Sequence, residues 1–311
     1  MKLLRDTALA ALCLTFVVVV VGAYVRLSDA GLGCPDWPLC YGNPMPAEIA
    51  DANALAKAWK EMGHRYLAGT LGVLLVALCF LCVRYKRSAG LALAIVILVI
   101  VQATLGKWTV TMLLKPAIVT AHLLGGMAIL ALLAWHALLQ GSHVAAPQAR
   151  TLRVPAAAAL ALLAMQIALG GWVSANYAAL ACLDLPLCRG QWMPPMDFAN
   201  AFHVVRELGQ TAEGGLLTNE ALTAIHWTHR MFALVVVAAT GWAAMKTLPV
   251  IRSLGVAVLS LLILQFLIGV ANVAFSLPLP LAAAHNAGAA LLLVALVVLN
   301  FFSFRGLRPS W

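Results

Sequence analysis

The chain of 311 residues is 63% hydrophobic and only 10% charged, with a formal net charge of +9. Soluble domains carry about 25% charged residues, so this composition excludes a soluble globular protein and indicates an integral membrane protein. The positive charge does not indicate a nucleic-acid partner, because basic residues in the loops of a multi-pass membrane protein set its orientation.

Apolar runs that are long enough to cross a bilayer follow one another along the chain. A membrane-spanning helix needs about 20 apolar residues, and these runs are continuous rather than alternating, which favours helices over a β-barrel. The first run follows basic residues, as in a signal peptide, but no small-residue cleavage site is evident, so we interpret it as a retained helix. We expect eight transmembrane helices near residues 8–25, 62–83, 90–107, 117–139, 155–175, 222–245, 254–274 and 282–304.

The basic residues predict the orientation of these helices. They gather in the connections of one side, where Asp6 is the only acid, and such basic loops stay in the cytoplasm. Both termini are therefore expected inside, and the loops 26–61 and 176–221 outside. Without an Arg-rich, acid-poor presequence, a bacterial cytoplasmic membrane is favoured over a mitochondrial one. The basic residues are Lys2, Arg5, Arg84, Lys86, Arg87, Arg150, Arg153, Lys246, Arg252, Arg305 and Arg308.

The two halves of the chain share several patterns. Residues 22–40 align without gaps on residues 170–188, and both runs end in C-x-D-x-P-L-C. We interpret the chain as two copies of a four-helix unit, 1–145 and 146–311. An even number of helices places both copies in the membrane in the same sense, so the repeat is parallel, unlike the inverted repeats of many transporters. The expected fold is an all-α integral membrane protein of two pseudo-symmetric four-helix bundles. A second shared pattern comprises Gln102-x-x-x-Gly106 before His122 and Gln265-x-x-x-Gly269 before His285.

Each expected outer loop of this repeat carries a cysteine pair. Cys34 and Cys40 lie in the first of these loops, and Cys182 and Cys188 in the other. Disulfides persist on that side of the membrane, and a Cys34–Cys40 or Cys182–Cys188 bond would stiffen a lid over its bundle, contributing about 2–3 kcal/mol. The repeated pattern favours this structural role, and a redox-active thiol pair is the alternative.

Four histidines occupy equivalent places in the two halves. His64, His122, His229 and His285 each lie at the outer end of an even-numbered helix. Two imidazoles that face one another across a bundle are the axial ligand set of a six-coordinate haem, whereas zinc requires four ligands. A single histidine could be a packing residue, but ionisable groups inside membranes are costly, and four at repeat-equivalent positions favour iron ligands.

The remaining histidines and cysteines have weaker support. His136, His143 and His203 lack equivalents in the other half, and we interpret them as structural. Cys13, Cys79 and Cys82 fall within helices. The Cys79-x-x-Cys82 pattern is interpreted as two small apolar residues, with a redox or metal pair as the alternative.

The halves differ beside the first histidine of each pair. Glu61 precedes His64 by three residues, and His226 precedes His229 by three, so each lies on the face of its histidine. A carboxylate beside a haem can accept a proton or stabilise positive charge, and the alternative is an acid at a helix N-terminus. This difference predicts a reactive first site and an electron-handling second site.

An arginine follows the first histidine of each pair, Arg65 in one half and Arg230 in the other. The guanidinium fork suits a haem propionate, although the side chain could instead extend to the membrane interface.

Taken together, the run from Arg26 to Gly42, the Glu61-x-x-His64-Arg65 motif and His229-Arg230 resemble the haem A synthase family from the first helix to the last. The resemblance implies oxidation of the C8 methyl group of haem O to a formyl group, which gives haem A for cytochrome oxidase. It implies a haem O site formed by His64 and His122 with Glu61 as the catalytic carboxylate. A haem b held by His229 and His285 follows in the second half. An accessory role of His226, in tuning haem b or passing protons, is left open.

The same resemblance implies haem O synthase and cytochrome oxidase assembly factors as partners, besides membrane lipid, and leaves a homo-oligomer open. A bis-histidine membrane cytochrome b that carries electrons is an alternative function, as is a haem transporter or chaperone. Glu61 speaks against an electron carrier, which needs no carboxylate at one site only. Two histidine ligands leave the iron without an open position, so either one detaches or the substrate is bound by one.

Overall fold

The computed structural model describes residues 2–46 and 49–309, and most of these residues are helical. Within those ranges eight helices are long and apolar enough to cross a membrane, which confirms the expected all-α multi-pass fold. They are α1 (Lys2–Leu27), α2 (Ala52–Arg84), α3 (Ala89–Thr111), α4 (Pro116–Leu139), α5 (Arg153–Ala175), α7 (Asn219–Thr247), α8 (Arg252–Ala274) and α9 (Leu279–Arg305).

Shorter elements lie between the membrane helices. The cysteine loop of the second half contains the 3₁₀ turn η2 (Ala178–Leu180) and the short helix α6 (Phe198–Ala201), and the 3₁₀ turn η1 (Pro147–Leu152) leads into α5. Strand β1 (His143–Ala145) pairs antiparallel with β2 (Leu307–Pro309). Hydropathy does not reveal such short pieces, and the sequence analysis did not predict them.

Helix α2 begins well outside the apolar run that revealed it. Asp51 caps its N-terminus, where the side chain accepts a hydrogen bond from the backbone N–H of Asn53 at 3.0 Å. The first turns carry lysines and an acid, so a hydropathy criterion places the start too late. Glu61 therefore lies in the interior of α2, and the alternative that it is a helix-terminal acid stabilised by the dipole is wrong.

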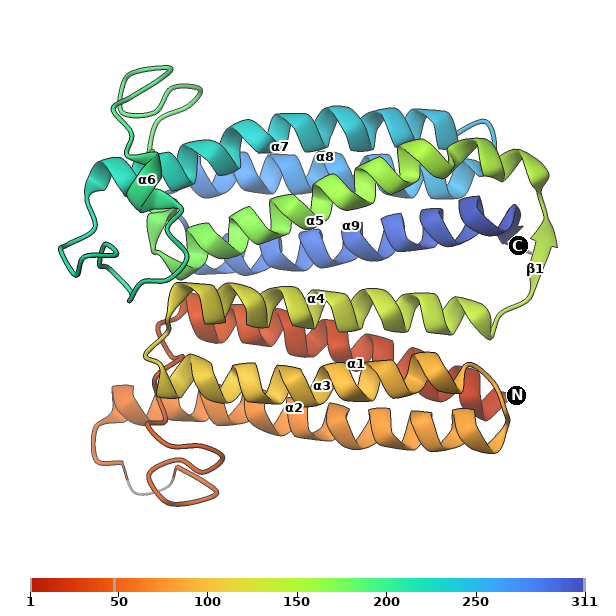
Figure 1. The fold of residues 1–311 in the computed structure, drawn as a ribbon, viewed down its shortest axis with the longest axis horizontal. Coiled ribbons are helices and arrows are strands. Elements are labelled where there is room, and N and C mark those ends of the chain that lie inside the picture. Colours follow the sequence, from red (N-terminus) through yellow and green to blue (C-terminus); the bar gives the residue numbers. More distant parts are fainter. Residues whose placement is uncertain (1, 47–48, 310–311) are drawn as a thin grey trace.

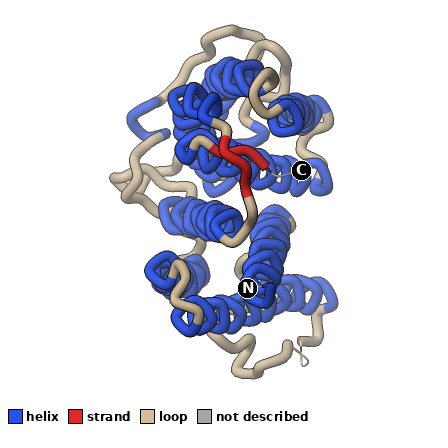
Figure 2. Tube along the Cα trace, turned by 90° about the vertical axis from the view of Figure 1, so that its right-hand side faces the viewer, coloured by secondary structure: helices blue, strands red, loops and turns tan. Residues whose placement is uncertain are grey.

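The membrane helices form two groups of four. In the first group α1 contacts α2 and α4, and α3 contacts the same two helices; in the second, α5 contacts α7 and α9, and α8 completes the ring. Figure 2 shows these two groups nearly end-on. Helices α1, α4, α5 and α9 join the groups. The order of neighbours is the same in both groups, while a symmetry axis that relates them stays a prediction.

The two ends of the molecule differ in what they carry. Both termini and β1 lie at one end, and both cysteine loops lie at the other (Figure 1). Large apolar side chains such as Val73, Phe80 and Ile100 are exposed on the outside of α2 and α3, as expected for helices that face lipid. In contrast, α9 is the most buried of the spanning helices and lies between the two groups.

Candidate functional site

In the first half, each of the two predicted histidines lies against a glycine of the neighbouring helix. A Cβ atom on Gly22 of α1 would be 2.8 Å from Cε1 of His64 on α2, and a Cβ on Gly106 of α3 would be 3.1 Å from Cε1 of His122 on α4. A Cβ atom essentially never lies within 3.0 Å of another atom, and a distance of 3.1 Å is shorter than most Cβ contacts. The absence of a side chain at these two positions is therefore what lets each imidazole lie on the backbone of the next helix.

The second half repeats this arrangement. His229 of α7 lies against Gly170 of α5, and His285 of α9 lies against Gly269 of α8; the distance from a Cβ to the imidazole Cε1 would be 3.1 Å in both cases. Each of the four predicted histidines thus packs against a glycine of the neighbouring helix, and we call this glycine its seat. Gly106 and Gly269 belong to the Gln-x-x-x-Gly patterns noted in the sequence, and the structure gives those patterns a physical role.

The histidines of each half come from helices that lie diagonally across their bundle. His64 and His122 come from α2 and α4, and they are close enough to interact electrostatically. His229 and His285, from α7 and α9, interact in the same way. Two of the four histidines thus belong to each bundle, on diagonal helices, while their action as ligand pairs stays a prediction.

These pairs fit a haem better than an isolated metal ion. Within residues 2–46 and 49–309, no group of three or more His, Cys, Asp or Glu side chains could hold a metal ion. In the same described ranges, Nδ1 of His64, His122 and His285 is buried without a hydrogen-bond partner. A buried polar atom without a partner is costly, and a ligand that engages these imidazoles would offset part of that cost. A haem iron takes one or two axial ligands from a protein, and a pair of histidines can supply both.

Glutamines hold the backbone of three of the four histidines. Nε2 of Gln265 donates to the carbonyl oxygen of His285 at 3.0 Å, and Nε2 of Gln166 donates to that of His229 at 3.1 Å. Gln102 donates to the carbonyl oxygen of His122. Each glutamine precedes the seat glycine by four residues and lies one helical turn from it. Gln166 was not singled out from the sequence, although Gln166-x-x-x-Gly170 has the same spacing as the other two Gln-x-x-x-Gly patterns.

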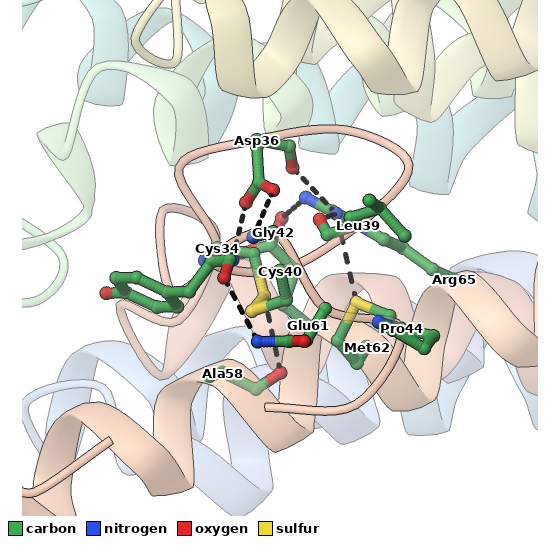
Figure 3. The surroundings of a disulfide bond; sticks show 12 residues. Cys34, Asp36, Leu39, Cys40, Gly42, Pro44, Ala58, Glu61, Met62 and Arg65 are labelled. Atoms are coloured by element: carbon green, nitrogen blue, oxygen red, sulfur yellow. Dashed lines mark hydrogen bonds and ion pairs between the residues drawn. A yellow bond between two sulfur atoms is a disulfide. The ribbon is translucent and has the colours of Figure 1, made fainter. Parts of the chain in front are cut away.

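Glu61 connects α2 to the first cysteine loop (Figure 3). The residue is only 4% exposed. Its Oε2 accepts a hydrogen bond from the backbone N–H of Cys34 at 2.9 Å, and its Oε1 lies 2.5 Å from Nη2 of Arg65. These contacts hold the carboxylate and orient it at the end of the first bundle where the cysteine loop lies.

His226 makes the equivalent contact with the cysteine loop of the second half. It is 5% exposed, and its Nδ1 lies 3.3 Å from the backbone nitrogen of Cys182, where it can accept the hydrogen bond. Glu61 and His226 are thus equivalent in what they contact as well as in sequence. An anchoring role for His226 was not foreseen, because the partner is a backbone group 44 residues away in the chain.

Arg65 and Arg230 also bind the cysteine loops. Nη1 of Arg65 donates to the carbonyl oxygens of Asp36 at 2.9 Å and Leu39 at 2.7 Å. Nη2 of Arg230 donates to those of Asp184 and Leu187, both at 3.1 Å. Each arginine therefore fastens a loop to its helix. In the described part of the chain Nη1 of Arg230 is buried without a partner, so a propionate contact there stays a prediction.

Both expected disulfides are present. The sulfur atoms are 2.00 Å apart in Cys34–Cys40 and 1.94 Å apart in Cys182–Cys188, which confirms both pairings. The bonds lie in the loops that Glu61, His226 and the two arginines fasten. The structure thus supports the interpretation of each loop as a covalent lid over its bundle.

An aspartate inside each disulfide loop organises the backbone. Asp36 accepts hydrogen bonds from the N–H groups of Tyr41 and Gly42 at 2.7 and 2.8 Å. Although partial desolvation acts in the opposite direction, the N–H groups of Gly42 and Tyr41 lower the pKa of Asp36. The N–H of Gly190 is the main cause of the lowered pKa of Asp184 in the second loop.

The remaining histidines lie apart from the two pairs. His136, in the last turns of α4, is fully buried with Nε2 3.3 Å from Sγ of Cys82. His143 contacts the carbonyl oxygen of Leu138 at 2.7 Å and packs edge-on against the ring of Phe301. These surroundings agree with the structural interpretation of both residues.

The fold and the site define a class: a multi-pass helical membrane protein with a pair of half-buried histidines in each of two four-helix groups. A sequence model of the COX15-CtaA family, described as "Cytochrome oxidase assembly protein", matches residues 5–297, and the chain belongs to that family.

Bacterial relatives extend along most of the chain. A protein named Heme A synthase from Shewanella oneidensis is 41% identical, and the match covers 94% of both chains. The Heme A synthase of Rhizorhabdus wittichii is 27% identical over 94% of this chain and 92% of the relative. That of Halalkalibacterium halodurans is 28% identical over 70% of this chain and 73% of the relative. The family and the eight spanning helices together identify a multi-pass bacterial membrane protein.

Proposed function

We propose that this chain is a haem A synthase, which oxidises the C8 methyl group of haem O to a formyl group. The observation that carries the proposal is the pair of half-buried, glycine-seated histidines in each half of a chain 41% identical to a Heme A synthase. Residues 1–145 would form the substrate half and residues 146–311 the haem b half. In this assignment the substrate is haem O, and the product serves cytochrome oxidase.

Each pair of histidines has a separate task in this proposal. His64 and His122 hold haem O, whereas His229 and His285 hold haem b. The haem groups supply the iron and the path for electrons, and the apolar helices accommodate the farnesyl tail of the substrate. Arg230, with its free Nη1, is the better of the two arginines for a propionate contact.

Glu61 is the proposed catalytic carboxylate. It lies one turn from His64 on the same face of α2, and Arg65 together with the N–H of Cys34 holds it in place. An ionised, immobilised carboxylate can accept a proton from the substrate or stabilise positive charge that develops beside it. His226 occupies the same place in the second half and offers no negative charge, which supports a non-reactive second site.

We also propose that both termini face the cytoplasm of a bacterial cell and that the histidine pairs lie toward the outer face of the membrane. Two observations support this orientation. The basic residues gather in the connections on one side of the helices, and both termini and β1 lie at the end opposite the cysteine loops.

The proposed reaction is tested by expressing the chain in cells that supply haem O and identifying the haems extracted from the purified protein. We expect haem A, or its hydroxylated intermediate, under aerobic conditions. Haem bound by the protein without either product would instead support the electron-carrier function. The His229→Ala variant should lose the haem b spectrum, and an unchanged reduced spectrum would contradict the assignment of the second site.

A further inference from the structure

One histidine of the four lacks the glutamine that holds the others. In α1 the position four residues before Gly22 is Val18, whereas Gln102, Gln166 and Gln265 take this position in α3, α5 and α8. The part of the chain that the structure describes shows no side chain that donates to the carbonyl oxygen of His64. We call a glutamine that donates to the carbonyl oxygen of a histidine its clamp. In the substrate half, His122 has such a clamp and His64 does not.

We propose that His64 is the exchangeable axial ligand of the first site and that His122 is the permanent one. The proposal rests on the proposed function, because it requires a haem between these two histidines. It answers how a site with two histidine ligands gains an open coordination position: His64 moves away from the iron while His122 stays.

In the second half the glutamine that holds the carbonyl oxygen also lies beside the imidazole ring. Besides donating to a carbonyl oxygen, Nε2 of Gln166 lies 3.2 Å from Nδ1 of His229, and Nε2 of Gln265 lies 3.4 Å from Nε2 of His285. Within the described residues of the first half, Gln102 donates only to the carbonyl oxygen of His122. His64 and His122 therefore differ in the hold on the backbone: a glutamine of the neighbouring helix restrains His122, so His64 is the one of the two that moves away more easily.

The local sequence around His64 points in the same direction. Gly63 precedes it directly, and a Cβ on Gly63 would meet no atom within 4 Å, so no packing requires a glycine there. A glycine inside a helix destabilises it by about 1 kcal/mol relative to alanine. The equivalent residue in α7 is Thr228, whose hydroxyl donates to the carbonyl oxygen of Ala224 at 2.7 Å. Of the two, α2 is therefore the helix that distorts more readily at its histidine.

The proposed catalytic carboxylate lies on the same helix as His64. Glu61 lies one turn away on the same face of α2. Departure of His64 would thus open the iron on the side of the haem where the proposed catalytic carboxylate lies, and His122 would retain the haem from the opposite side.

A pair of alanine variants of the full chain tests this assignment by spectroscopy. Reduced His64→Ala protein should keep the first-site haem in a five-coordinate, high-spin form that binds carbon monoxide. His122→Ala should lose that haem. The reverse pattern, or equal loss in both variants, would overturn the inference and leave the haem site standing. If neither variant changes the haem content or spectrum, no haem binds between these residues and the proposed function fails.

A second experiment adds the missing clamp without removing a ligand. In Val18→Gln the new amide should hold His64, and a hydrogen bond worth about 1 kcal/mol corresponds to an about five-fold lower affinity of the reduced first site for carbon monoxide. The matched variant Gln166→Val should raise carbon monoxide binding at the second site by a similar factor. A Val18→Gln protein with a full haem load and unchanged carbon monoxide affinity would refute the inference.

Discussion

At the scale of single residues, the site depends on glycines, because their lack of a side chain leaves room for the histidines. The glycines opposite the histidines give each imidazole a place on the neighbouring helix, although glycine weakens a membrane helix as it does any other. These glycines therefore lower the stability of their helices in exchange for the space that the imidazoles occupy.

Helix α3 allows a matched test of this role. In Gly106→Ala the new methyl group would be 3.1 Å from Cε1 of His122, so the imidazole must shift and the haem content of the first site should fall several-fold. Gly90→Ala in the same helix meets no atom within 4 Å and should leave the haem content unchanged while stabilising α3 by up to about 1 kcal/mol. The ratio of haem to purified protein measures both effects. Equal haem loss in the two variants would show that helix content, and not the seat, controls binding.

Glu61 and His226 allow the chemistry of a side chain to be separated from its anchoring contact. Glu61→Gln keeps an acceptor for the N–H of Cys34 but removes the negative charge, so both haems should be retained while conversion of haem O falls about 10²-fold or more. His226→Gln makes the corresponding change beside Cys182 and should leave conversion near that of the unmodified protein. Haem extraction after aerobic growth gives both results. Conversion that survives in Glu61→Gln would remove this residue from the mechanism.

At the scale of elements, each cysteine loop is a compact lid fastened at several points. A disulfide closes it, an aspartate organises its turn, and an arginine of the underlying helix binds its carbonyl groups. A loop that short gains only about 2 kcal/mol from its disulfide in the chain-entropy model, so the polar contacts contribute a comparable part of its order.

The lids should respond to acid in a defined pH range. The pKa values of Asp36 and Asp184 are lowered from the ordinary value of 3.8. A lowered folded-state pKa stabilises the lid above the unfolded-state value, and this contribution is lost as the pH falls through the folded-state pKa. Backbone amide exchange in residues 34–42 should therefore be constant from pH 7 down to about 4, after correction for intrinsic exchange rates, and rise below it. In Asp36→Ala the first lid should exchange faster at pH 7 and lack this acid transition, whereas the second lid, left unchanged, serves as the internal control.

At the scale of the whole molecule, the two halves are joined at both ends. At the end with the lids, Nη2 of Arg26 donates to the carbonyl oxygen of Ser174 at 2.9 Å, and its guanidinium lies 4.0 Å from the ring centre of Tyr177. Lys115 and Glu207 form an ion pair at 2.7 Å nearby. At the opposite end, β1 and β2 connect the linker between the halves to the C-terminal segment. These contacts hold the two predicted haem sites at a fixed separation.

The contacts at the lid end should differ in strength. The side chain of Arg26 is only 12% exposed, so Arg26→Ala should lower the free energy of unfolding by about 2–3 kcal/mol through the lost charged hydrogen bond and ring contact. Lys115→Ala removes a more exposed ion pair and should cost about 0–1 kcal/mol. Thermal unfolding in detergent compares the two variants. An equal or larger loss in Lys115→Ala would contradict this account of how the halves are joined.

Much of this organisation could be predicted from the sequence, for identifiable physical reasons. The bilayer requires long apolar segments, so hydropathy located all the membrane helices, and His64, His122, His229 and His285 stood out because ionisable residues are rare in such segments. The start of α2 was placed about ten residues too late because its first turns are polar and lie outside the apolar run. The strands β1 and β2 were not predicted because they pair across most of the second half of the chain.

The sequence by itself determined the class of protein, the spanning helices, the cysteine pairs and the four histidines, since membrane solvation and an internal repeat act on the sequence directly. Only the tertiary structure decided that glycines seat the imidazoles, that Glu61 and His226 hold the lids, and that Arg65 and Arg230 bind loop carbonyls. The same is true of the missing clamp beside His64. Each of these contacts joins groups from different helices or loops, and a hydropathy pattern carries no information about which side chains meet across them.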